Sequence, residues 1–326
     1  MYLSAWWLTP RAAMEYRYYI PAGLTEDLSC FHDPVMDESN LRQLSSQQYA
    51  AFWRDGYLVA PKAVSETMLN QLRELLAQWT EDSRSHPSSY GETIDGRPRF
   101  DVAPCHSADA PALRRVDNPS EIDGRFAAAC FDSAMVDMAA DLIGPDLKFH
   151  HSKINLKLPR TETRVDYHQD FSYTPHTNDH VVTALLMLDD MSEDNGCLMV
   201  VPGSHCEGQQ TLWQGDRFTG KVNTETTNDA LRRAVAITGS AGSVCLMHSK
   251  LLHGSEPNRG LHQRALMIAV YSAADAVPIA KSPLPNQFEG RIVRGRPTRM
   301  VRLDSGVIEL PANYRAASFF EVQESN

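Results

Sequence analysis

The chain has 326 residues, 42% of them hydrophobic, which is enough for one large domain or two ordinary ones with a substantial buried core. Its formal net charge of −10 argues against binding to nucleic acid or to an anionic membrane, because either partner needs a basic surface. Six cysteines without a Cys-x-x-Cys pair indicate neither a zinc knuckle nor a disulfide framework, so we expect reduced thiols in a cytoplasmic protein that acts on small molecules.

Residues 1–42 show little periodicity and are predicted to form an irregular arm. We do not expect a signal peptide there, since the apolar start has no basic segment before it. No stretch approaches the roughly 18 to 20 apolar residues that span a bilayer. We expect a single domain over residues 43–326, with a C-terminal extension of unassigned role, and the oligomeric state stays open.

The first part of this domain has helical signals. Helices are predicted at residues 45–55, 65–79 and 126–143, because apolar side chains recur at helical spacing in each. A short strand is expected at residues 57–60. Residues 81–113 are polar and rich in Pro, Ser and Gly, which predicts a long loop and a candidate lid over a ligand site.

From residue 147 the periodicity changes, and residues 149–158 alternate roughly between apolar and polar, which is typical of a β-strand. Further strands are predicted at residues 181–188, 197–201, 243–248 and 265–271. Short strands after a helical part, without a glycine-rich phosphate loop, favour a mainly β fold with flanking helices, namely a double-stranded β-helix (jelly roll) of the cupin type. Residues 207–236, polar with interleaved aromatics, are a second candidate lid.

Two candidate metal ligands, His168 and Asp170, lie two residues apart. In an extended segment the side chains at positions i and i+2 project from one face, so this imidazole and this carboxylate can meet one cation. Two histidines and one carboxylate on a single face hold ferrous iron and leave three positions open, so a distant histidine is required. His253, at the end of a later apolar stretch, is the third candidate ligand.

Arg264, eleven residues after His253, opens the following strand, where its planar guanidinium could face inward and bind a carboxylate. Together these residues resemble the phytanoyl-CoA dioxygenase family of iron(II)- and 2-oxoglutarate-dependent oxygenases. The resemblance spans roughly residues 44–271. Its strongest segments are 168–170, 195–205 and 253–255.

The resemblance implies roles for particular residues. The implied iron(II) ligands are His168, Asp170 and His253. The implied contacts of the cosubstrate 2-oxoglutarate are Arg264, at its distal carboxylate, and more loosely Ser255, Lys153 and Arg115. With O2 as the other cosubstrate, the expected reaction is hydroxylation of a C–H bond with release of succinate and carbon dioxide, and the carboxylate of Asp170 disfavours halogenation.

The resemblance to the family does not imply that this chain acts on the same substrate as the mammalian enzyme. Leu186 stands where the mammalian phytanoyl-CoA enzyme has a tryptophan that contacts the cosubstrate, which predicts a pocket of different shape. The acidic chain also lacks a dense basic run for the phosphates of an acyl-CoA. We therefore expect a small metabolite or a natural-product intermediate as the substrate.

Two other classes of protein stay open. A jelly-roll isomerase or hydrolase could use the same three side chains for a different divalent metal, although Arg264 would then have no assigned role. A catalytically idle binding module would need no open iron site. The remaining histidines are expected to be structural or solvent-facing, and His248 in particular to be a packed strand histidine, because it lacks an arginine at the spacing that separates His253 from Arg264.

Overall fold

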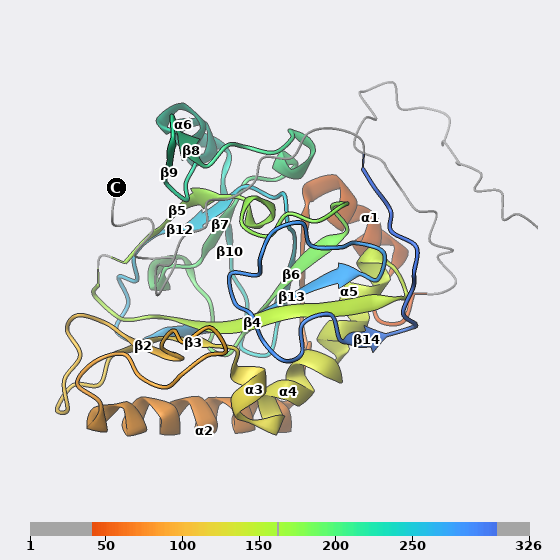
Figure 1. The fold of residues 1–326 in the computed structure, drawn as a ribbon. Helices are drawn as coiled ribbons and strands as arrows, with labels where there is room; N and C mark the ends of the chain where they lie inside the picture. Colours follow the sequence, from red (N-terminus) through yellow and green to blue (C-terminus); the bar gives the residue numbers. More distant parts are fainter. Residues whose placement is uncertain (1–40, 162, 305–326) are drawn as a thin grey trace, which may run out of the picture.

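The computed structural model of the protein describes residues 41–161 and 163–304, and two antiparallel sheets form its centre (Figure 1). The strands of the larger sheet are β1 Tyr57–Ala60, β2 Phe100–Val102, β3 Leu113–Asp117, β4 Leu147–Lys157, β6 Val181–Met187, β11 Val244–His248, β13 Arg264–Ala273 and β14 Ile292–Arg294. Their order is β1-β11-β6-β13-β4-β3-β2, with β14 beside β4. The strands of the smaller sheet, in spatial order, are β10 Val235–Ile237, β7 Leu198–Val200, β12 His253–Ser255 and β5 Val165–His168.

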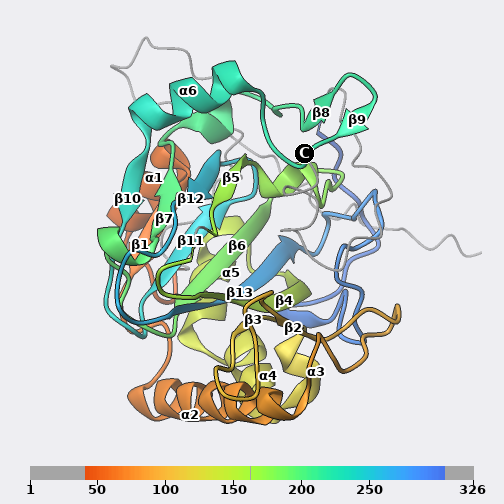
Figure 2. The ribbon, with the colours of Figure 1, turned by 90° about the vertical axis from the view of Figure 1, so that its left-hand side faces the viewer.

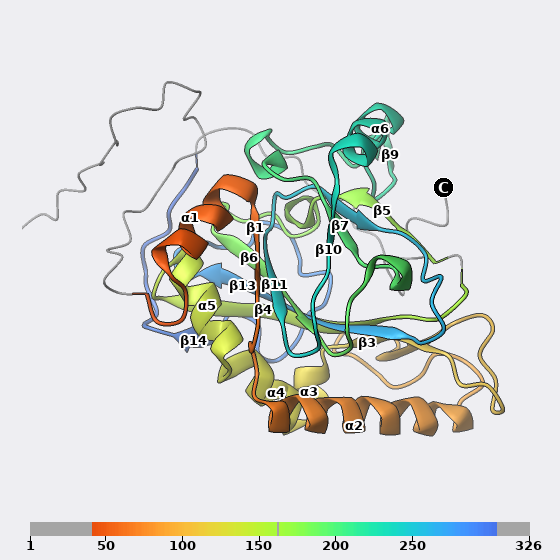
Figure 3. The same cartoon turned by 180° about the vertical axis from the view of Figure 1, so that it is seen from behind.

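Helices flank these sheets, as predicted. Their bounds are α1 Ser46–Asp55, α2 Glu66–Asp82, α3 Pro119–Ile122, α4 Gly124–Phe131, α5 Ala134–Ile143 and α6 Thr224–Arg233. Helices α2 to α5 cover one face of the larger sheet, whereas α6 lies at the other end of the molecule, near the smaller sheet (Figures 2 and 3). None of the helices in the described ranges is both long and apolar enough to cross a bilayer.

The first two helices begin where the sequence predicts. The side chain of Ser45 accepts a hydrogen bond from the backbone of Gln48, whose own side chain bonds back to Ser45, forming a capping box. Ser65 caps α2 in the same manner through Met68. Gly56 ends α1 with a φ of 82°, and a Cβ there would lie 2.5 Å from a ring nitrogen of His205, so only glycine fits this turn.

The helix predicted at residues 126–143 is wrong in one respect, because it is two helices, α4 and α5. The chain breaks at Asp132 and Ser133, where Ser133 has extended backbone and its hydroxyl donates to the carbonyl of Ala129 at 2.7 Å. Such local side-chain bonding competes with helix formation. Helix α6 was not predicted at all, since Ala230 is its only buried residue and the helix therefore has no apolar stripe.

The larger sheet buries side chains on both faces. Alternate residues such as Leu186, Leu246 and Met267 pack with the helices, and their neighbours pack against the smaller sheet. The space between the two sheets is therefore where a ligand site can form. The predicted arm at residues 1–42 falls almost wholly outside the described residues, as does the part of the C-terminal extension after residue 304.

Candidate metal and cosubstrate site

The three predicted metal ligands meet between the sheets. His168 ends β5 and His253 begins β12, and the pairing of these two strands sets the histidines directly opposite each other. Asp170 follows at the start of a 3-10 turn. The Nε2 atoms of His168 and His253 lie 3.6 and 3.7 Å from Oδ1 of Asp170. Within the described ranges this is the one group of at least three His, Cys, Asp or Glu side chains close enough to share a metal ion.

Backbone carbonyls determine which ring nitrogen of each histidine faces the metal position. Nδ1 of His168 lies 2.8 Å from the carbonyl oxygen of Asp166, and Nδ1 of His253 lies 2.9 Å from that of Leu251. A carbonyl oxygen only accepts hydrogen bonds, so each Nδ1 carries the hydrogen and donates it. The lone pair of each neutral imidazole is then at Nε2, which is the form that binds a metal.

The carboxylate of Asp170 is held in place and kept ionised. Its Oδ2 accepts a hydrogen bond of 2.7 Å from the hydroxyl of Thr183 on β6. Burial works to raise the pKa of Asp170, but the neighbouring His253, His168 and Lys153 lower it well below the usual range for a carboxyl. Burial also lowers the pKa of His253 to about 4, so this imidazole is neutral at pH 7. Two imidazoles and one carboxylate are the donor set that suits non-haem iron(II).

Thr183 gives the first test of this geometry. We expect Thr183→Val to weaken iron(II) binding about tenfold to a hundredfold, because groups that orient metal ligands contribute in that range. Thr183→Ser should restore most of the affinity, since serine keeps the hydroxyl that bonds to Asp170. Anaerobic titration with iron(II) measures both variants. If the valine variant bound iron as tightly as the wild type, Thr183 would not position the carboxylate.

A cavity of about 120 Å³ opens beside the three ligands, and both Arg264 from β13 and Ser255 from β12 line it. Arg264 is only 3% exposed. One of its terminal nitrogens donates to the carbonyl of Gly196, while its Nε has no hydrogen-bond partner among the described residues. Burial lowers its pKa to about 10, so it stays charged. A buried guanidinium with an unsatisfied N–H is costly, and a carboxylate arriving in the cavity would relieve that cost.

Lys157 is a second cation at this end of the cavity, and the sequence analysis missed it. It lies directly opposite Arg264 across β4 and β13, and its Nζ donates to the carbonyl of Glu256. Burial, with Arg264 adding to the effect, lowers its pKa to about 7. Residues four apart on a strand project from the same face, so Lys157 shares the face of Lys153 on β4. This spacing could have identified Lys157 from the sequence.

The other two predicted cosubstrate contacts line the same cavity, but not the same end of it. Lys153 pairs with Ile268, four residues along the strands from the pair of Lys157 and Arg264, or about 13 Å at the usual rise. Arg115 is on β3, two strands away from β13, which is about 10 Å at the usual spacing. That these two cations contact 2-oxoglutarate stays a prediction.

Two further expectations concern neighbouring strand residues. His248 is a packed histidine, as expected: it is buried in β11 against the rings of Phe52 and Trp53, and burial lowers its pKa to about 3. The expectation that Leu186 shapes the pocket is wrong, because Leu186 faces the helices and Leu185 lines the cavity. On a strand, a shift of one residue moves a side chain to the other face.

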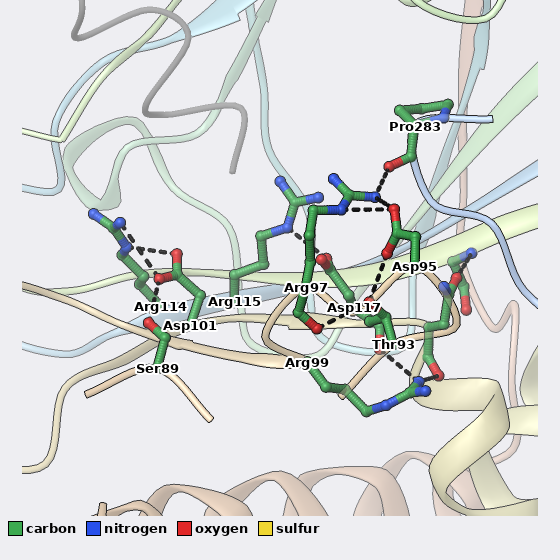
Figure 4. Close-up of polar contacts among 12 residues, drawn as sticks. Ser89, Thr93, Asp95, Arg97, Arg99, Asp101, Arg114, Arg115, Asp117 and Pro283 are labelled. Atoms are coloured by element: carbon green, nitrogen blue, oxygen red, sulfur yellow. Dashed lines mark hydrogen bonds and ion pairs between the residues drawn. The ribbon is translucent and has the colours of Figure 1, made fainter. Parts of the chain in front are cut away.

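The two candidate lids relate to the cavity differently. From residues 81–113, Arg97 lines the cavity, and its guanidinium donates to Asp95 and to the carbonyl of Pro283, another lining residue (Figure 4). None of residues 207–236 lines it. That segment instead accepts a 2.6 Å hydrogen bond at the Gly220 carbonyl from Tyr173, whose ring packs edge-on against His168.

Comparisons with known proteins place this chain among described enzymes. The model of the phytanoyl-CoA dioxygenase (PhyH) family matches residues 52–266. A probable alpha-ketoglutarate-dependent hypophosphite dioxygenase of Stutzerimonas stutzeri is 33% identical over 204 residues, which are 61% of this chain and 69% of that protein. An ectoine dioxygenase of Sphingopyxis alaskensis is 28% identical over 263 residues, 74% of this chain and 80% of that protein.

A solved structure shows the same fold. The crystal structure of EctD from S. alaskensis with 2-oxoglutarate and 5-hydroxyectoine superimposes with a TM-score of 0.63 at 24% identity, covering 85% of this chain and 94% of that one. The predicted jelly-roll class is thereby confirmed.

Proposed function

This chain belongs to the phytanoyl-CoA dioxygenase (PhyH) family, and from that premise we propose that His168, Asp170 and His253 hold its iron(II) while Arg264 and Ser255 hold its 2-oxoglutarate. The chain is an iron(II)- and 2-oxoglutarate-dependent dioxygenase with O2 as cosubstrate. The observation that carries the residue assignments is that one cavity contains both a facial set of two imidazoles and a carboxylate and a buried guanidinium with an unsatisfied N–H.

The protein's own contribution is to bind and orient. When bound, iron(II) with 2-oxoglutarate and O2 supplies the oxidant for hydroxylation of a C–H bond, with succinate and carbon dioxide as products. Backbone carbonyls keep both Nε2 lone pairs free, and Thr183 holds the carboxylate of Asp170. Apolar side chains such as Leu185 and Leu266 line the cavity and help to exclude water from the reacting groups.

A small metabolite is the proposed substrate class. The relatives act on hypophosphite and on ectoine, according to their names, which supports a compact substrate over an acyl-CoA. The cavity volume of about 120 Å³ is near that of an engineered cavity that holds one benzene molecule, so groups that reach the metal must be small. We also propose, as the composition predicts, that the protein works in the cytoplasm without a nucleic-acid partner.

Anaerobic spectroscopy tests the proposal. Adding iron(II) and then 2-oxoglutarate to the protein is expected to produce a metal-to-ligand charge-transfer absorption band, because the keto acid would chelate the iron. Admission of O2 should then convert 2-oxoglutarate to succinate even without substrate. A folded protein that showed no band would favour a non-oxidative isomerase or hydrolase, and one that showed a band but formed no succinate would favour an idle binding module.

A further inference from the structure

Gln169 lies between two of the proposed metal ligands, in the stretch of residues 167–173 that we call the ligand turn. His168 ends β5, and Gln169 continues with extended backbone, at a φ of −114° and a ψ of 133°. Its side chain therefore projects to the side opposite to that of His168, away from the metal position. Gln169 is fully buried, so its amide needs partners within the protein for both of its hydrogens and for its oxygen.

The amide of Gln169 has all three of these partners, and they come from two distant parts of the chain. Its Nε2 donates to the carbonyl of Lys250 at 2.6 Å and to the carbonyl of Gly208 at 3.0 Å. Its Oε1 accepts from the backbone N–H of Gln210 at 2.7 Å. Carbonyls only accept and a backbone N–H only donates, so this amide fits in one orientation and neither a carboxylate nor an apolar side chain can replace it.

The bond to Lys250 connects the ligand turn with the backbone that leads to the third ligand. Lys250 lies three residues before His253. A second bond joins the same two stretches, because the N–H of Phe171 donates to the carbonyl of Ser249 at 2.8 Å. Gln169 thus helps to fix the distance between the strand of the first two ligands and the strand of the third.

The other partners of the amide belong to residues 208–222, which we call the clamp segment. The clamp segment includes the short strands β8 Trp213–Gln214 and β9 Arg217–Phe218, at the same end of the molecule as β5 (Figure 1). Besides its bonds to Gln169, the segment accepts the hydroxyl of Tyr173 at the Gly220 carbonyl, at 2.6 Å. The segment is therefore bonded to the ligand turn at both of its ends.

Buried apolar side chains join the clamp segment to the same strands. The residues that precede the two histidine ligands, Tyr167 and Leu252, share one hydrophobic cluster with Leu212 and Val222 of the segment. The N–H of Val222 also donates to the carbonyl of Tyr167 at 2.9 Å. A displacement of the segment would therefore move the backbone beside both histidines.

Resting on the proposed function, we propose that Gln169 is a positioning residue for the metal: its amide holds the backbone of His168 and Asp170 against the clamp segment and Lys250. Groups behind metal ligands influence affinity because they fix the direction in which the ligands point. The coupling is reciprocal, so bonds that favour the metal-binding geometry are themselves favoured by the bound metal. The bound metal thus stabilises a segment that does not line the cavity.

Hydrogen exchange of the wild-type protein with and without iron(II), in the absence of O2, tests the reciprocal effect. The amides of Gln210 and Val222 donate to the ligand turn, so they exchange when the clamp segment opens. We expect iron(II) to slow both about fivefold or more, which is the lower end of the usual range of coupling. The amide of His106, which bonds to the Ala103 carbonyl away from the cavity, should exchange at an unchanged rate.

Two variants test the role of the side chains. Gln169→Met keeps the length of the side chain and removes all three hydrogen bonds, so we expect it to weaken iron(II) binding about tenfold to a hundredfold. It should also abolish the effect of iron(II) on the exchange of the clamp segment. Tyr173→Phe keeps the ring against His168 but loses the bond to Gly220, and should weaken iron(II) binding about two- to tenfold, the value of one hydrogen bond.

Two matched controls separate positioning from general stability. Asn286 is also a buried amide that donates to two backbone carbonyls and accepts from one backbone N–H, and the hydroxyl of Tyr271 donates to the Cys130 carbonyl at 2.9 Å. Asn286→Leu and Tyr271→Phe should lower the melting temperature and leave iron(II) affinity unchanged. If Gln169→Met does not fold, Tyr173→Phe and the exchange of the wild type decide the question.

Three results would overturn the inference and leave the proposed function intact. They are wild-type iron(II) affinity in folded Gln169→Met and Tyr173→Phe, exchange of Gln210 and Val222 that iron(II) does not change in wild type that binds it, and an equal loss of iron(II) affinity in the two controls. Wild type that bound no iron(II) would instead remove the proposed function and this inference together.

Discussion

Alanine at His168, Asp170 or His253 is expected to lower iron-dependent formation of succinate more than about a hundredfold, because even residues that only orient metal ligands contribute tenfold to a hundredfold. Each change removes one of the three side chains whose potential ligand atoms lie within 4.8 Å of one another. Two donors hold iron weakly, so bound iron should fall with activity. Succinate formation and iron content after gel filtration measure the two effects, and circular dichroism reports whether the fold is kept.

His248 supplies the contrasting control for this experiment. It is also a buried strand histidine, but its ring packs on Phe52 and Trp53, and its Nδ1 accepts a hydrogen bond from the backbone of Lys250. His248→Ala should therefore lower the melting temperature and keep the iron affinity of the wild type. If His253→Ala kept normal turnover while His248→Ala lost iron, the ligand assignment would be wrong.

Arg264→Ala is expected to weaken 2-oxoglutarate binding by about one to two orders of magnitude. Hydrogen bonds to charged groups contribute roughly 1.5 to 3 kcal/mol, and each 1.4 kcal/mol changes an affinity about tenfold. Arg264→Lys should lose less, because an ammonium keeps the charge but cannot form two parallel bonds to a carboxylate. Iron affinity should barely change, since Arg264 is not among the metal ligands.

Titration of 2-oxoglutarate into iron-loaded, oxygen-free protein, followed by the charge-transfer band, measures these affinities. Arg259→Ala is a matched control, because Arg259 is exposed and does not line the cavity. Lys157→Met tests the second cation at this end of the cavity. Because Lys157 lies opposite Arg264, we expect this change to lower 2-oxoglutarate affinity, but by less than Arg264→Ala does. Equal affinities in wild type, Arg264→Ala and Arg264→Lys would place Arg264 outside the cosubstrate pocket.

Local sequence patterns were sufficient to predict many of the helices and strands. The side chains at Ser45 and Ser65 mark helix starts because capping depends on a few neighbouring residues. A rough alternation of apolar and polar residues marks the long strand β4, because each residue's face depends only on its position within the strand. A continuous apolar run marks β13, which is buried on both faces. The same rule predicts that His168 and Asp170 lie close together, and they do, although Asp170 follows the strand in a 3-10 turn. The sequence pattern around His253 predicts the third member of this group.

Tertiary packing decided what those rules leave open. Alternation says that Lys153 and Lys157 share a face, but only the register of β4 against β13 shows that Lys157, and not Lys153, lies opposite Arg264.

The same holds for the details of the metal site. The hydroxyl of Thr183 and the carbonyls of Asp166 and Leu251 reach the metal ligands from positions that no sequence spacing relates to them.

Sequence by itself determined the class of chemistry, because that depends on which side chains are present and on their local spacing. The structure decided that Arg264 and Lys157 lie at one end of the cavity and Arg115 and Lys153 at another, because strands distant in the chain are brought into register only by burial of their shared core.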